Sequence, residues 1–244
     1  MHGAGPGARV LDGADVQKLG RVGCERHVDV RRLGRSPICH HVRMTVRAVI
    51  FDVGGVLEVT PPTGWLEVWR ARLGLAWYEG VSQLEAAWRA GRVGGISLQE
   101  VEQRTAEVLG LDETQLLLFM DDLWTEYLGT LNRELTDYFA ALRPRYKTAI
   151  LSNSFVGARE REREAYRFEE LCDVVVYSHE EGMEKPDPAF YGIVTERLGV
   201  QPGETVFLDD TEACVEGARR VGMTGVLFVG NEQAIAELET YLKE

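Results

Sequence analysis

The chain lacks the long apolar runs, the basic excess and the closely spaced cysteines that mark three large classes of protein. No stretch of its 244 residues approaches the roughly 18 consecutive apolar residues of a membrane-spanning helix. The net charge of −12 argues against the basic face that nucleic-acid binding requires. We therefore expect neither a membrane nor a nucleic acid as a partner. The chain has only four cysteines, Cys24, Cys39, Cys172 and Cys214. They lie far apart in a chain large enough to fold without disulfides, so we expect reduced thiols and a cytoplasmic protein.

The first 43 residues differ from the rest in charge and in pattern. They hold eight lysines and arginines against four acids, a net of +4, which leaves −16 on residues 44–244. They show no helical or strand period, and the apolar run of a secretory signal is missing. We predict that residues 1–43 are a flexible or non-native extension ahead of a start at Met44 and contribute nothing to the core.

Five short apolar runs after Val46 predict a buried parallel sheet. The runs lie at 46–51, 147–151, 173–177, 205–208 and 225–229. Helical patterns separate the later runs, near 156–170, 187–199, 212–222 and 231–243. Alternation of strands and helices predicts an α/β fold, a doubly wound parallel sheet with helices on both faces.

A stretch of about 90 residues without a strand pattern separates the first two runs. It indicates helices near 64–73, 80–90, 97–109, 112–128 and 132–143. Ser97 and Glu100 form a capping box ahead of one of them. All five tryptophans fall in this stretch, at positions typical of a helical core. A crossover between parallel strands needs only about a dozen residues. We therefore predict a helical domain at 59–144, inserted into a core made of 44–58 and 145–244.

Polar side chains follow the predicted strands at the edge where their carboxyl ends meet. They are Asp52 after the first strand, Ser152 and Asn153 after the second, Lys185 in the loop beyond the third, and Asp209 and Asp210 after the fourth. In an open parallel sheet this edge forms the ligand crevice. Carboxylates held this close repel one another unless a cation lies among them, and oxygen ligands suit Mg²⁺. With a lysine and a serine beside it, such a cation makes a cradle for a phosphoryl group.

The order of these residues resembles the motifs of the haloacid dehalogenase-like (HAD) hydrolase superfamily, which consists mostly of phosphatases. The matching segments are FDVGGVL at 51–57, ILSNS at 150–154, KPDP at 185–188 and FLDD at 207–210. The resemblance runs from about Val46 to Gly230. It implies a HAD-like Rossmannoid core, with the helical insert as a cap that closes over the site. It further implies Mg²⁺-dependent hydrolysis of a small phosphorylated metabolite through an aspartyl-phosphate.

The resemblance also implies a role for each matched catalytic and substrate-binding residue. Asp52 would be the nucleophile, Ser152 would hydrogen-bond the transferring phosphoryl group, and Lys185 would neutralise its charge and hold Asp52. Asn153 and Gly55 would form the substrate side of the site. Gly55 would do so by allowing a tight loop whose amides face the phosphate.

The metal ligands implied by the resemblance are three carboxylates and one carbonyl. Asp210 would bind Mg²⁺ directly, and Asp209 would act through a coordinated water. The carboxylate of Asp52 and the backbone carbonyl of Gly54 would complete the ligands that the protein supplies.

The sequence departs from the family pattern at two positions. Most family phosphatases have a second aspartate two residues after the nucleophile, as general acid and then base, and here that residue is Gly54. General acid–base catalysis contributes about 10²–10⁴-fold in rate. Either another group protonates the leaving oxygen, or the reaction is slow, or the chemistry differs. Cys214 stands where an asparagine is common.

Two alternatives follow from the missing aspartate. The family's 2-haloacid dehalogenases also lack it, but they usually replace the fourth-motif acids and carry an aromatic residue after the nucleophile. Here that residue is Val53, and Asp209 and Asp210 are both present. The other alternative is a catalytically weak binding or regulatory protein with the same fold, which the intact Asp52 and Lys185 oppose.

The identity of the substrate is not encoded in any motif, and a homodimer stays open. Arg70, Arg89 and Arg92 of the insert are the cations that could reach an anionic substrate. We expect each of them on a solvated helix face.

Overall fold

The computed structural model describes residues 45–242, and the predicted extension at 1–43 lies outside the described residues. Its centre is a five-stranded sheet in the order β5-β4-β1-β6-β7, in which every neighbouring pair is parallel. The strands are β1 (Ala48–Phe51), β4 (Lys147–Ser152), β5 (Val174–Tyr177), β6 (Thr205–Asp209) and β7 (Thr224–Leu227). Each predicted apolar run overlaps one of these strands, which confirms the α/β parallel-sheet class.

Strand β1 occupies the middle of the sheet because every one of its side chains is apolar and fully buried. Alternate residues point to opposite faces. Val49 and Phe51 pack on one face, where the ring of Phe51 stacks on that of Phe139 at 4.6 Å. Ala48 and Ile50 pack on the other face. The first face is covered by α6 (Arg133–Leu142) and α12 (Asn231–Leu242), and the second by α10 (Pro188–Leu198) and α11 (Glu212–Arg220).

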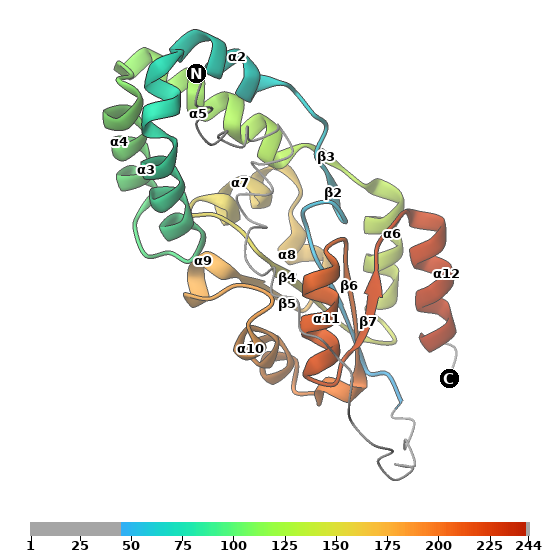
Figure 1. The fold of residues 1–244 in the computed structure, drawn as a ribbon. Helices are drawn as coiled ribbons and strands as arrows, with labels where there is room; N and C mark the ends of the chain where they lie inside the picture. The colour runs from blue at the N-terminus through green and yellow to red at the C-terminus, as the bar shows by residue number, and fades with distance from the viewer. Residues whose placement is uncertain (1–44, 243–244) are drawn as a thin grey trace, which may run out of the picture.

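The segment between β1 and β4 contains a small antiparallel pair of strands that the sequence pattern did not indicate. The pair joins β2 (Glu58–Val59) to β3 (Thr130–Leu131). Four helices lie between them, α2 (Trp65–Leu73), α3 (Leu75–Arg92), α4 (Leu98–Leu109) and α5 (Glu113–Leu128). They gather together beside the sheet (Figure 1).

The tryptophans of this segment are core residues, as expected. Trp65 and Trp69 meet the ring of Phe119 edge-on, at centroid distances of 5.1 and 5.2 Å. The predicted capping box is present at the start of α4, where the side chain of Ser97 accepts from the amide of Glu100. The four helices therefore share one aromatic core, separate from the two cores on the faces of the sheet.

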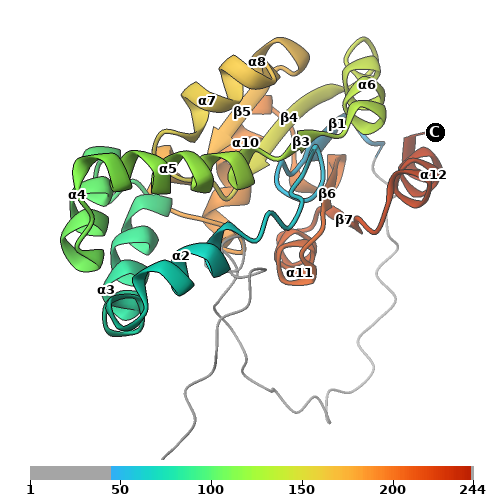
Figure 2. The ribbon, with the colours of Figure 1, turned by 90° about the horizontal axis from the view of Figure 1, so that it is seen from above.

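Two helical predictions differ from the structure. Residues 132–143, expected in the insert, form α6, which packs on the sheet beside α12 through Leu135 and Phe139 (Figure 2). An amphipathic pattern predicts that a helix has a buried face. It does not predict against which core that face packs. The helix expected at 156–170 is divided into α7 (Ala158–Ala165) and α8 (Phe168–Leu171), because Arg167 adopts a positive φ of 57°. The short helices α9 (Ser178–Glu181) and η1 (Pro202–Glu204) complete the described elements.

The carboxyl ends of β1, β4 and β6 bring three of the predicted site segments to one edge of the sheet. Parallel pairing aligns Phe51 of β1 with Ile150 and Leu208 of its neighbours, so the residues that follow these positions emerge side by side. None of the helices in residues 45–242 is long and apolar enough to cross a membrane.

Candidate active site

Asp52, directly after β1, forms an ion pair with Lys185 from the loop that precedes α10. The Lys185 Nζ lies 2.7 Å from Oδ1 of Asp52 and 2.7 Å from Oδ2 of Asp209. The side chain of Lys185 is 1% exposed and that of Asp209 is fully buried. One ammonium therefore serves two carboxylates, of which Asp209 is fully buried and Asp52 is still 12% exposed.

The three aspartates predicted to bind a metal are brought together. Asp52, Asp209 and Asp210 each offer a carboxylate oxygen, and these oxygens lie within 4.8 Å of one another. Burial raises the pKa of Asp52 to about 8, with further repulsion from Asp209 and Asp210, although Lys185 opposes the shift. Burial alone would lower the pKa of Lys185, but the carboxylates of Asp209 and Asp52 raise it. Three carboxylates and one ammonium leave a surplus of negative charge, and this donor set fits a divalent hard cation.

The two adjacent aspartates after β6 differ in what their oxygens contact. Both oxygens of Asp209 are engaged, Oδ2 by Lys185 and Oδ1 by the amide of Thr211 at 2.8 Å. Asp210 is only partly buried, and Thr211 Oγ1 donates to its Oδ1 at 3.2 Å. This division agrees with the prediction that Asp210 ligates directly and Asp209 through water, which stays a prediction.

The loop after Asp52 turns tightly through its two glycines. The carbonyl of Val53 accepts from the amides of Val56 at 3.1 Å and Glu58 at 2.9 Å. Gly55 has a φ of 79°, a conformation that side chains other than glycine disfavour. Gly54 is not among the described residues with positive φ. The backbone at position 54 is therefore open to a residue with a side chain, whereas position 55 requires glycine.

Ser152 and Asn153 end β4 with different surroundings. Ser152 is buried, and its hydroxyl has no hydrogen-bond partner within residues 45–242, which leaves it available to a ligand. The side chain of Asn153 is bound twice to the backbone of Lys185. Its Nδ2 donates to the carbonyl at 2.9 Å, and its Oδ1 accepts from the amide at 2.7 Å. These contacts make Asn153 a support for Lys185, while its prediction as a substrate ligand stays untested.

Arg92 is a site neighbour that sequence reasoning misjudged. The expectation of a solvated face is wrong for Arg92, which is 9% exposed, and for Arg70, whose side chain is 12% exposed, whereas Arg89 is exposed as expected. The guanidinium of Arg92 donates from Nε and Nη2 to the carboxylate of Glu184 at 3.2 and 3.3 Å. Its carbonyl accepts from Ser178 Oγ at 2.7 Å. Since Glu184 immediately precedes Lys185, this pair ties the insert to the segment that carries the lysine.

Buried glutamate and tyrosine side chains form a cluster between the insert and the sheet. No sequence motif predicted this cluster. Glu162 of α7 accepts from Tyr177 at 2.5 Å and from Tyr127 of α5 at 3.4 Å. Burial raises the pKa of Glu162 to about 7, although both tyrosines and Arg159 lower it. Glu58 of β2 is also buried, and burial raises its pKa to about 8.

We expect Glu162→Gln to flatten the decline of stability between about pH 5 and 8. A carboxyl whose pKa rises on folding stabilises the fold fully below its unfolded value of 4.5. That contribution is lost as the pH rises through about 7. The free energy of unfolding of the variant, relative to the wild type, should therefore increase by about 1–3 kcal/mol across this range. Urea titrations at a series of pH values would measure it. Glu160→Gln, an exposed change on the same helix, is the matched control, and equal slopes for all three proteins would contradict the prediction.

Comparison with known proteins agrees with this geometry. The family model of haloacid dehalogenase-like hydrolases matches residues 46–222. A phosphatase of Mycobacterium tuberculosis, MT3486, is 29% identical over 75% of this chain and 88% of its own length. Mouse acyl-CoA dehydrogenase family member 10 is 28% identical over 83% of this chain, which spans only 20% of that larger protein.

A solved structure matches most of the fold. The HAD family enzyme bt-2542 of Bacteroides thetaiotaomicron, in complex with magnesium and inorganic phosphate, superposes with a TM-score of 0.67 at 23% identity. The match covers 78% of this chain and 98% of that one. At this identity the likeness establishes the fold. With the family model matching most of the chain, the protein belongs to the haloacid dehalogenase-like hydrolases and is a hydrolase of that type.

Proposed function

We propose that this protein is a Mg²⁺-dependent phosphoric monoester hydrolase that acts on a small phosphorylated metabolite in the cytoplasm. The observation that carries the proposal is the nucleophile candidate Asp52, held by Lys185 beside the carboxylates of Asp209 and Asp210. A phosphatase among its relatives and the magnesium and phosphate bound by the Bacteroides enzyme support it. The helices α2–α5 would act as the cap that selects the substrate.

The contacts of Asp52 assign its two oxygens different tasks. Oδ1 pairs with Lys185 Nζ and accepts from the amide of Val53 at 2.8 Å, so Oδ2 is the attacking oxygen. A bond forms between Oδ2 and phosphorus while the bond to the ester oxygen breaks, and the leaving alkoxide takes up a proton. Water then attacks the phosphorus of the aspartyl-phosphate, which releases phosphate and regenerates Asp52.

The remaining residues position and neutralise the phosphoryl group. The hydroxyl of Ser152 donates to one of its oxygens, and Lys185 offsets part of its charge while it fixes Asp52. Asp52, Asp210 and the Gly54 carbonyl would hold Mg²⁺, with Asp209 acting through water. When bound, the ion would stabilise the negative charge that the carboxylates otherwise repel.

Metal removal tests the proposal directly. Phosphate release from a panel of phosphorylated metabolites should stop in EDTA and return with added Mg²⁺. Asp210→Asn should raise the half-saturating Mg²⁺ concentration by roughly tenfold or more, because it removes a formal charge from a hard-cation site. Asp121→Asn, an exposed aspartate on α5, is the control. Full activity in EDTA would overturn the proposal.

The glycine at position 54 predicts a preference among leaving groups. Without an acid there, departure of a sugar alkoxide is limited by protonation, whereas a phenolate leaves with less help. We expect aryl phosphates to be cleaved about 10²-fold faster than simple alkyl phosphates. Gly54→Asp should narrow that gap, since the backbone at 54 has no positive φ to strain a side chain. Turnover on matched aryl and alkyl esters measures both effects. Equal rates in the wild type would contradict the prediction and direct the search for another acid to Glu58.

The 2-haloacid dehalogenase alternative is favoured by Gly54 alone. A dehalogenase needs no metal ion, so dehalogenation gives no reason for Asp209 and Asp210 to lie beside Asp52. Halide release from chloroacetate in EDTA would support it. Beryllofluoride bound to Asp52 would mimic the phosphorylated residue. If it binds there but no phosphate ester is hydrolysed, the result would instead support a binding or regulatory protein.

A further inference from the structure

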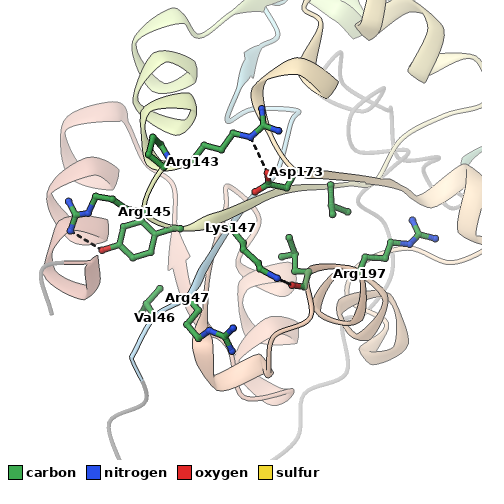
Figure 3. Close-up of a pocket in the computed structure, with 11 residues that line it drawn as sticks. Val46, Arg47, Arg143, Arg145, Lys147, Asp173 and Arg197 are labelled. Atoms are coloured by element: carbon green, nitrogen blue, oxygen red, sulfur yellow. Dashed lines mark hydrogen bonds and ion pairs between the residues drawn. The ribbon is translucent and has the colours of Figure 1, made fainter.

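A basic hollow lies at the amino ends of β1, β4 and β5, at the opposite end of the sheet from Asp52. It has a volume of about 640 Å³, and Figure 3 shows the residues that line it, with Lys147 between Arg145 on one side and Arg197 on the other. Its cationic side chains are Arg47, Arg143, Arg145, Lys147 and Arg197. Arg47 precedes β1 and Asp52 follows it, so the backbone positions of these two residues are about 16 Å apart along the strand direction.

The hollow is lined mostly by positively charged side chains, although the chain as a whole is negatively charged. The protein carries a net charge of −12, yet this one concavity gathers five of its 27 lysines and arginines. Among residues 45–242, Asp173 is the only acidic residue that lines it. Cations crowded together in this way repel one another, and an anion among them relieves that repulsion.

Three of the arginines hold their present partners loosely. The ion pairs join Arg47 to Glu204 at 3.2 Å, Arg143 to Asp173 at 3.0 Å and Arg197 to Glu181 at 2.7 Å. The arginine side chains in these pairs are still 53%, 45% and 43% exposed. Ion pairs this exposed contribute little to stability. The guanidinium groups of Arg47 and Arg197 can therefore turn to another anion at small cost, whereas that of Arg143 would also give up its hydrogen bond to the carbonyl of Glu170 at 3.0 Å.

The two remaining cations, Arg145 and Lys147, differ in their partners. Within the part of the chain that the structure describes, no carboxylate pairs with Arg145. Its guanidinium lies 5.3 Å from the centre of the Tyr146 ring and donates to the phenol oxygen at 3.2 Å. Lys147 donates to the carbonyl of Leu198 at 2.5 Å, at the end of α10, which fixes its ammonium among the arginines.

We propose that this hollow binds a polyphosphate, either an inorganic chain or the phosphate tail of a nucleotide. Guanidinium groups form paired hydrogen bonds with phosphate oxygens, and four of them around one ammonium match several phosphoryl groups in a row. The volume is that of a small-molecule site. The proposal is independent of the catalytic function, because none of the five cations belongs to the catalytic site.

Titration calorimetry on the Asp52→Asn protein in EDTA tests the proposal without turnover or metal at the catalytic site. Tripolyphosphate and ATP are the two probes. Both should bind, and Arg145→Ala should weaken both about tenfold, because it removes a charge-assisted contact from a side chain without an acidic partner. Arg143→Ala/Arg145→Ala should weaken them further. Tighter binding of ATP would identify a nucleotide as the better ligand, and tighter binding of tripolyphosphate an inorganic chain.

The matched control is Arg104→Ala/Arg163→Ala, which removes the same charge from exposed positions on α4 and α7. It should leave both affinities unchanged. Equal weakening in the control, or equal competition by sulfate at matched ionic strength, would show general electrostatic attraction and overturn the proposal. No binding of either probe at millimolar concentration would overturn it as well.

Discussion

Asp52→Asn should abolish phosphate release, by about 10⁴-fold or more, while the protein stays folded. The substitution keeps the shape of the side chain but removes the charge that attacks phosphorus. The fold should survive because the substitution also removes one of three crowded carboxylates. Initial rates and a thermal melt of the same preparation measure the two quantities.

An exposed aspartate on the sheet-covering helix α6 offers the control. Asp137→Asn makes the same chemical change far from the acidic cluster, and it should alter neither rate nor melting temperature. Wild-type activity in the Asp52→Asn protein would end the aspartyl-phosphate hypothesis. Loss of activity together with unfolding would show that Asp52 is needed for the core and would leave the nucleophile to be sought elsewhere.

Lys185→Met should destabilise the protein by about 3–5 kcal/mol at neutral pH and abolish catalysis. The lysine is the ammonium that faces both Asp52 and Asp209, and its removal leaves two buried carboxylates without their cation. Urea denaturation measures the loss. Adding Asp209→Asn should recover part of the stability but none of the activity.

The control for this substitution is Lys147→Met. Lys147 is exposed and donates a single hydrogen bond to a helix carbonyl, so its loss should cost no more than about 1.5 kcal/mol. Equal destabilisation by the two substitutions would contradict the view that Lys185 is held by buried charge.

The residues at the strand ends could be predicted because their signals are local. A short apolar run followed by Asp52, or by Asp209 and Asp210, specifies both the strand and the edge to which the acid is carried. Parallel pairing then brings those edges together without any knowledge of the packing. The proximity of the three aspartates could therefore be predicted from the sequence, although the role of each one stays a prediction.

The contacts that cross between the insert and the sheet could not be predicted in this way. Arg92 and Glu184 lie 92 residues apart, and neither stands in a motif that mentions the other. Glu162 reads as one more acid on a strongly charged helix, and only the packing of Tyr127 and Tyr177 shows that it is buried. Such pairs depend on how the core of helices α2–α5 packs against the sheet. The periodicity of a single helix does not predict that packing.

The two-residue ladder of β2 and β3 has a consequence for how this chain can be rebuilt. Val59 and Thr130 face each other across the ladder, so the two ends of segment 60–129 stand one strand spacing apart, about 4.8 Å. A segment whose ends lie this close can be exchanged with little displacement of the two ends, provided that its replacement also supplies partners for Glu184 and Glu162, which Arg92 and Tyr127 contact here. The position is thus a natural graft point, at which a helical segment from a related hydrolase can be installed over the same acidic cluster. Chimeras joined there would test whether helices α2–α5 select the substrate, as proposed above.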